Sequence, residues 1–121
     1  MKNFILLDEN AVYFEASFSC DNVLFLSLEG NNYFITDARY TTEAQELTKN
    51  CEVIESSNLI QTAQDILIKN KIKKIMFDPN DFKYSTYIKL TQDIKTTFVA
   101  KENFSKLKRI IKKDEEVKIL K

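Results

Sequence analysis

The chain has 121 residues, of which 44% are hydrophobic, and its 18 Lys and Arg residues balance 18 Asp and Glu residues. This length fits a single domain that buries about two-thirds of its unfolded surface, and the hydrophobic content excludes a disordered tail. The longest apolar runs are far shorter than the ~20 residues that cross a bilayer, and no secretory leader is recognisable. We therefore expect a cytoplasmic protein with no membrane partner.

Histidine is absent and cysteine occurs twice. Because histidine is the commonest general base and metal ligand, a reaction catalysed by this chain alone would have to proceed without imidazole. Cys20 and Cys51 lie far apart, without the CxxC spacing of a zinc or redox site, and we expect two reduced thiols. A disulfide between them stays open, because it requires Cα atoms within ~7 Å of each other.

The charges are unevenly distributed along the chain. Residues 1–60 hold three basic against ten acidic residues, a net charge of −7, whereas residues 61–121 hold fifteen basic against eight acidic residues, a net charge of +7. Nearly all the basic residues are Lys interleaved with acids, and Arg, the usual reader of base edges, is rare. This pattern favours a solvated surface or two complementary poles of an oligomer over a nucleic-acid-binding tail. No nucleic-acid partner is expected.

The first part of the chain predicts four short strands and one helix. Apolar runs bounded by turn-forming residues indicate the strands at residues 4–7, 11–14, 23–28 and 33–36. The last two form a predicted hairpin, because Glu29-Gly30-Asn31-Asn32 between them tolerates positive φ. Residues 41–47 then predict a helix with Thr41 or Thr42 as its N-cap.

The second part of the chain alternates strands with helices. Residues 52–55 predict a strand, and Asn58 caps an amphipathic helix whose apolar residues recur at helical spacing to about residue 70. The remaining expected elements are a strand at 74–78 that ends before Pro79, a helix at 85–95, a strand at 97–100 and a long basic helix from Phe104 onward. A hairpin followed by such alternation is typical of an α/β sandwich around one mixed sheet.

The densest polar cluster in the sequence is formed by Asp37, Arg39 and Tyr40. Aspartate can act as a base or a nucleophile, but this spacing favours a strand-to-helix turn fixed by an Asp37–Arg39 ion pair. Asp78 and Asp81 on either side of Pro79 favour a turn over a catalytic carboxylate pair. A single glycine cannot build a phosphate-binding loop or a nucleophile elbow. The residues by themselves thus predict an α/β domain with no complete active site.

Three segments match, in order, the motifs of one known family. Phe34-Ile35-Thr36-Asp37-Ala38-Arg39-Tyr40, followed by Glu43-Ala44, has the pattern of two hydrophobic residues and Thr-Asp-x-Arg-Tyr-x-x-x-Ala. Upstream, Asn10, Tyr13 and Phe18-Ser19-Cys20-Asp21-Asn22 follow an Asn-x-x-Tyr … Phe-Ser-Gly-Ser-Asn stretch, with Ser17, Cys20 and Asp21 replacing Gly, Gly and Ser. Arg109-Ile110-Ile111-Lys112 and Glu116-Val117 complete the set. Together they resemble the amino-terminal domain of the creatinase, prolidase and Xaa-Pro aminopeptidase family.

The resemblance implies a fold and a division of the chain. The expected fold is α/β, a three-layer sandwich with a mixed, mostly six-stranded sheet flanked by helices, similar to ribonuclease H. Residues 1–103 would be the creatinase-type amino-terminal domain, and residues 104–121 the connection to a catalytic domain and the start of its first helix. That catalytic domain binds two divalent metal ions (Mn, Co or Zn) through two Asp, one His and two Glu. None of these motifs is present here, so the resemblance implies the front part of a larger enzyme.

The resemblance also implies a function. The chain would be the non-catalytic domain of a Xaa-Pro aminopeptidase or dipeptidase, a metallo-hydrolase, and would contact its own catalytic domain and a homodimer partner. It would shape the access of Xaa-Pro peptides through a loop with Asp21 as a polar contact: Phe18, Ser19, Cys20, Asp21 and Asn22. Asp37, Arg39 and Tyr40 would be a structural signature, with no catalytic residue and no metal ligand in this chain. The alternative is a stand-alone protein-interaction module on the same fold.

Overall fold

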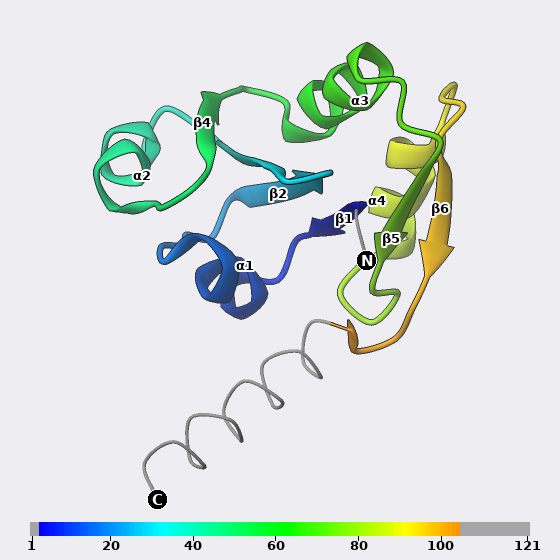
Figure 1. The fold of residues 1–121 in the computed structure, drawn as a ribbon, viewed down its shortest axis with the longest axis horizontal. Coiled ribbons are helices and arrows are strands. Elements are labelled where there is room, and N and C mark those ends of the chain that lie inside the picture. The colour runs from blue at the N-terminus through cyan, green and yellow to red at the C-terminus, as the bar shows by residue number, and fades with distance from the viewer. Residues whose placement is uncertain (1–2, 105–121) are drawn as a thin grey trace, which may run out of the picture.

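The computed structural model describes residues 3–104, which form one six-stranded sheet and four helices (Figure 1). The elements, in chain order, are β1 (Asn3–Leu6), α1 (Glu9–Ala16), β2 (Val23–Leu28), β3 (Asn31–Thr36), α2 (Thr41–Leu47), β4 (Glu52–Glu55), α3 (Leu59–Lys69), β5 (Lys74–Phe77), α4 (Tyr84–Thr91) and β6 (Thr97–Ala100). Within this part of the chain, no helix combines the length and the apolar character that crossing a membrane requires.

The sheet is mixed, with the strand order β4-β3-β2-β1-β5-β6. Strand β2 is antiparallel to both β1 and β3, whereas the pairs β3–β4, β1–β5 and β5–β6 are parallel. All described strands except β2 therefore run in one direction, and their carboxyl ends meet at one edge of the sheet. We call this the carboxyl edge, and the opposite one the amino edge.

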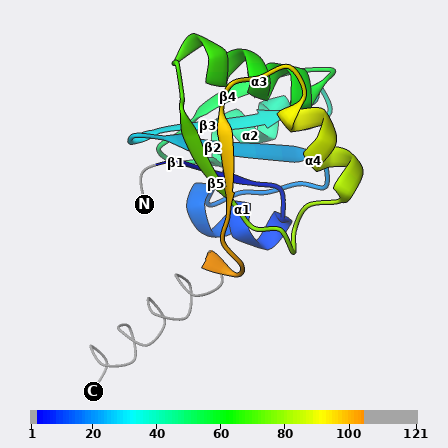
Figure 2. The ribbon, with the colours of Figure 1, turned by 90° about the vertical axis from the view of Figure 1, so that its right-hand side faces the viewer.

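The core consists of two hydrophobic clusters, one on each face of the sheet. Side chains alternate along β2, so that Phe25 packs with residues of α1 and α2, while Leu24 and Leu26 pack with residues of α3 and α4. Figure 2 shows α3 and α1 on opposite sides of the strands. Because helices cover both faces, all six residues of β2 are buried. The predicted three-layer α/β sandwich with a mixed six-stranded sheet is confirmed.

The predicted hairpin is present, and its turn is tight. Leu28 pairs with Asn31, which leaves a two-residue turn with Glu29 at φ 50° and Gly30 at φ 93°. Two consecutive positive φ values match the type I′ turn, whose twist suits the flanking strands. Strand β3 consequently begins at Asn31, two residues earlier than the apolar pattern predicts.

The predicted strand at residues 11–14 is wrong, because these residues lie in α1. The Asp8 carboxylate accepts a hydrogen bond from the backbone N–H of Ala11 at 3.0 Å and caps the helix. Val12 and Ala16, one helical turn apart, are fully buried against the sheet. A strand over 11–14 would lose both the cap and this pairing, so packing decides against the local apolar run.

The boundaries of α2 and α4 also differ from the predictions. The N-cap position of α2 is Tyr40, and Thr41 instead begins the helix, with its hydroxyl donating to the Asp37 carbonyl at 2.9 Å. Helix α4 ends at Thr91, short of residue 95, because the Gln64 amide donates to three carbonyls at its end. The two cysteines are free thiols. The predicted basic helix lies, apart from Phe104, outside the described residues.

Ser17 ends α1 in the left-handed region, with φ 67° and ψ 9°. A side chain costs roughly 1–2 kcal/mol in this conformation, and glycine avoids that cost. We expect Ser17→Gly to raise the free energy of unfolding by about 0.5–1 kcal/mol, net of the greater entropy of the unfolded chain. Urea denaturation would measure the change. Ser57→Gly is the control: Ser57 is exposed and is not among the positive-φ residues, so glycine there should lower stability slightly.

Candidate functional site

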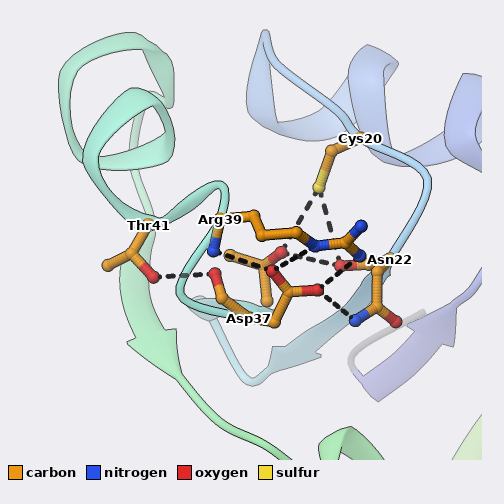
Figure 3. Close-up of polar contacts among 6 residues, drawn as sticks. Cys20, Asn22, Asp37, Arg39 and Thr41 are labelled. Carbon is orange, nitrogen blue, oxygen red and sulfur yellow. Dashed lines mark hydrogen bonds and ion pairs between the residues drawn. The ribbon is translucent and has the colours of Figure 1, made fainter.

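The site predicted from the family motifs lies at the carboxyl edge, where the chain enters β2 and leaves β3. Val23 pairs with Thr36 in the β2–β3 register, so Asn22 and Asp37, one step beyond, face each other. The Asn22 side-chain amide donates a hydrogen bond to Asp37 Oδ2 (Figure 3). The sheet register thus brings together two motifs that are separate in sequence.

The Asp37 carboxylate is fully engaged by neighbouring donors. Its Oδ1 accepts from the backbone N–H of Arg39 at 2.9 Å and from Arg39 Nε at 3.2 Å, and its Oδ2 accepts from the other arm of the same guanidinium at 2.9 Å. The Asp37 carbonyl accepts from the backbone N–H of Tyr40 at 3.1 Å. These contacts fold the segment between β3 and α2 into a fixed turn.

Hydrogen bonds from the Arg39 side chain, followed by that from Asn22, hold the pKa of Asp37 well below its usual range. A general base works best when its pKa lies near the operating pH. Asp37 is therefore a weak base, and the geometry favours a structural role for it over a hydrolytic one.

The lowered pKa of Asp37 gives a pH prediction with a defined sign. Because the folded-state pKa lies below the unfolded-state value, the stabilisation by the carboxylate is complete above the unfolded pKa, near 4, and is lost as the pH falls through the folded pKa. We expect carbon-detected NMR titration to place the Asp37 pKa below its usual range in the wild type and closer to 4 in Arg39→Gln. An equal pKa in both proteins would contradict the assignment, and Lys49→Gln, which changes an exposed cation elsewhere, is the control.

The predicted access loop, residues 18–22, is held from the inside of the domain. The Phe18 ring packs on that of Phe34, with centroids 5.8 Å apart. The buried Thr36 hydroxyl donates to the Asn22 carbonyl at 2.7 Å, and Cys20 Sγ lies 3.4 Å from the same hydroxyl. Burial raises the pKa of the Cys20 thiol, which makes it a poor nucleophile. The loop is therefore anchored by its first, third and fifth residues.

The outer surface of the loop carries a small polar platform. Asp21 is exposed, and hydrogen bonding to its carboxylate raises the pKa of Tyr40. The Arg39 guanidinium lies over the Tyr40 ring at 5.0 Å from the centroid. A shallow hollow of about 350 Å³ adjoins this platform, with Asp21 on one side and Asn58 on the other. The structure thus places Asp21, Arg39 and Tyr40 together on an accessible surface.

Two buried hydroxyl groups at the site are not recognisable from the motifs alone. Thr36 is fully buried, and its hydroxyl connects the loop to β3. Ser19 has a buried hydroxyl oxygen with no hydrogen-bond partner among the described residues. Both lie inside the family motifs, but their burial arises from tertiary packing, and a polar residue in a motif does not reveal it.

The described residues do not fit a metal centre. Within residues 3–104, no group of three Cys, Asp or Glu side chains is arranged to hold a metal ion. The family resemblance implies a two-metal site in a separate catalytic domain, and we assign no metal-dependent step to the described residues.

Comparison with known proteins identifies the family of this chain. Residues 3–114 match the Creatinase/Prolidase N-terminal domain family, and the chain belongs to that family. It is 42% identical, over 91 residues, to an uncharacterized peptidase, YqhT, of Bacillus subtilis (strain 168), covering 72% of this chain and 25% of that protein. The chain thus spans about a quarter of the length of this curated relative.

Solved structures of peptidases share the fold. A Xaa-Pro dipeptidase from Bacillus anthracis superposes with a TM-score of 0.85 at 25% identity, over 98% of this chain and 34% of that one. A Xaa-Pro aminopeptidase from Streptococcus thermophilus gives a TM-score of 0.81 at 23% identity, over 90% of this chain and 85% of that one. The first of these structures extends well beyond the region that matches this chain.

Proposed function

We propose that this chain is the non-catalytic amino-terminal domain of a proline-specific metallopeptidase of the cytoplasm, either a Xaa-Pro aminopeptidase or a dipeptidase. Family membership and the larger size of its peptidase relatives support this role. The two divalent metal ions and the residues that bind them would lie in a catalytic domain that follows in the parent enzyme. This domain would contribute to subunit assembly and to substrate access.

The observation that carries the proposal is the anchored loop of residues 18–22 with Asp21 on its outer surface. Hydrogen bonds from Asn22 to Asp37 and from Thr36 to the loop backbone hold the loop in one conformation. Such preorganisation suits a surface that limits the length of a bound peptide, because little conformational entropy is lost when the peptide docks. The exposed Asp21 carboxylate is suited to meet a positively charged group, such as the amino terminus of a peptide.

The full-length enzyme that contains this domain provides the test. We expect Asp21→Ala to change the ratio of kcat/KM between Xaa-Pro dipeptides and longer peptides severalfold, with bound metal unchanged. Glu55→Ala is the matched control, since Glu55 is an exposed acid at the end of β4 on the same edge. An unchanged ratio in Asp21→Ala would contradict the role of the loop.

Two simpler measurements test whether catalysis belongs to a separate domain of the parent enzyme. The purified 121-residue chain, supplied with Mn²⁺ or Co²⁺, should release no product from Xaa-Pro peptides, and turnover that persists through further purification would refute the non-catalytic assignment. The genomic reading frame should continue past Lys121 into Asp, Asp, His, Glu and Glu metal motifs. A stop codon there would favour the stand-alone interaction module instead.

A further inference from the structure

A second candidate site lies at the amino edge of the sheet, away from the loop of residues 18–22. The turn after α3 and the turn after α4 lie side by side where β5 and β6 begin (Figure 1). Between them is a hollow of about 480 Å³. Its lining includes Ile68, Ile72 and Ile94 as apolar residues and Lys71, Lys73 and Lys95 as basic ones. We call it the lysine-rimmed groove.

The lining of the groove is largely apolar, and several of its polar groups are already hydrogen-bonded. The Thr96 hydroxyl donates to the Ile72 carbonyl at 2.7 Å, and the backbone N–H of Ile72 donates to the Leu67 carbonyl at 3.0 Å. The Lys73 carbonyl accepts from the backbone N–H of Thr97 at 2.8 Å. Ile68, at the side of the groove, is 58% exposed. A ligand would therefore meet mainly hydrocarbon surface.

The rim of the groove is positively charged. Lys71, Lys73 and Lys95 are all exposed, and Asp93 is the one acid that lines the groove. No salt bridge within 4.0 Å is seen between any of these three lysines and another described residue. Lysine side chains keep their ammonium groups in water while their methylene stems cover apolar surface. The groove thus combines an apolar floor with a cationic rim.

The walls of the groove are held in place without a ligand. After α3, Lys71 takes a left-handed conformation at φ 54°, and its N–H donates to the Ile68 carbonyl at 3.1 Å, so a regular helix cap fixes this turn. After α4, the Gln64 amide donates to the carbonyls of Leu90 and Gln92, which fixes the start of the other turn. Binding sites for small molecules are usually pre-formed in this way.

We propose that the lysine-rimmed groove binds an aliphatic carboxylate, with the chain on the isoleucine floor and the carboxylate among the lysines. The charge of the rim selects an anion, and the floor selects hydrocarbon. A peptide is a poorer fit, because its polar amide N–H and C=O groups would lie against a largely apolar lining. The hollow of about 480 Å³ lies within the usual size range of small-molecule sites.

The test is a titration of the ¹⁵N-labelled chain, followed by amide NMR shifts. Octanoate should shift the amides of residues 71–73 and 93–96, and each CH₂ added from butyrate to octanoate should raise the affinity about two- to fourfold. Octanol, which lacks the charge, and acetate, which lacks the chain, should each bind at least tenfold more weakly. Shifts that spread over the whole domain, or equal affinity for octanol and octanoate, would overturn the proposal.

Variants test the contributions of the lysine rim and of the apolar lining separately. Lys73→Gln with Lys95→Gln should weaken octanoate binding by roughly three- to tenfold, because two cations that face the carboxylate are lost. Ile68→Ser should reduce the dependence on chain length, and its fold is secure because Ile68 is largely exposed. Lys49→Gln, beside β4 at the far end of the sheet, is the control and should leave binding unchanged. Equal losses in Lys49→Gln and the double variant would refute a specific rim.

A peptide with a free carboxyl-terminal leucine distinguishes the source of the carboxylate. We expect it to bind more weakly than octanoate, since its polar amides would lie against a largely apolar lining. Tighter binding of this peptide than of octanoate would overturn the aliphatic assignment. Because the assay uses binding to this chain alone, its outcome is independent of the peptidase role proposed above.

Discussion

Replacing Phe34 by alanine is expected to lower the free energy of unfolding by about 3–5 kcal/mol, the largest effect among our predictions. Phe34 is fully buried in β3, and its Cα partner on β2 is Phe25, which is also buried. Removal of the ring leaves a cavity in a sheet covered on both faces, where neighbouring side chains have little freedom to collapse. For a domain whose total stability is about 5–15 kcal/mol, this loss is large.

The same substitution should loosen the loop of residues 18–22, because the Phe18 ring packs on Phe34. Urea denaturation would measure the stability. The rate at which the buried Cys20 reacts with a thiol reagent would show whether the loop has loosened. Tyr84→Ala is the control, since Tyr84 is 80% exposed and should change stability by less than about 0.5 kcal/mol. A small effect for Phe34→Ala, or unchanged reactivity of Cys20, would show that the loop is held by its hydrogen bonds alone.

The second large effect is expected at Asp78, which is 2% exposed at the end of β5. Its carboxylate accepts hydrogen bonds from the backbone N–H groups of Asn80 and Asn103, both at 2.9 Å. Asp78→Ala removes both acceptors and should lower the free energy of unfolding by about 2–4 kcal/mol, because hydrogen bonds to a charged group contribute more than neutral ones. Thermal or urea unfolding provides the measurement.

Two further variants make the Asp78 prediction specific. Asp78→Asn keeps one acceptor oxygen, and we expect a stability between those of the wild type and Asp78→Ala. Asp65→Ala, which removes an exposed aspartate that accepts only from Gln61 on the same helix in the described contacts, should cost less than about 0.5 kcal/mol. If Asp78→Asn were as unstable as Asp78→Ala, the charge would matter more than the number of acceptors. A cost for Asp78→Ala no larger than for Asp65→Ala would contradict the structural role.

The Asp78 contacts also define the conformation of the segment around Pro79. The predicted turn at Asp78–Asp81 is confirmed, because the backbone N–H of Asp81 donates to the Asp78 carbonyl at 3.0 Å. Through Asn103, the same residue ties the end of β5 to the segment that follows β6. Asp78 therefore positions the chain where it leaves the described domain, which is a structural task and not an acid–base one.

Local sequence patterns were sufficient to predict most of the helices and strands. The hairpin strands are apolar runs flanked by turn-forming residues, and α3 has a clear periodicity of 3.6 residues. Asn58 caps α3 as predicted, with its side chain accepting from the backbone N–H of Gln61 at 3.1 Å. Helix α1 was missed because its apolar residues are adjacent and resemble a strand. The buried face of α1 and its Asp8 cap could be recognised only after the sheet that α1 packs against was known.

The contacts of the candidate site likewise fall into two groups, those that the sequence predicts and those that depend on the tertiary structure. The Asp37–Arg39 pair joins residues two positions apart, so its contact could be anticipated from the sequence. The contacts between Asn22 and Asp37, and between Cys20 and Thr36, join residues 15 and 16 positions apart and depend on the register of β2 against β3. A shift of this register by one residue would separate the partners of both contacts. The motif residues were recognisable, but their arrangement was not.

The sequence by itself thus determined the order of most elements, the class of the fold and the family motifs, because these depend on spacing along the chain. It also showed that no histidine is available for a metal centre in these 121 residues. Only the tertiary structure decided which side chains meet at the carboxyl edge and that two distant turns enclose the lysine-rimmed groove. Those contacts arise from strand pairing and helix packing between remote segments, and local sequence patterns do not specify such pairings.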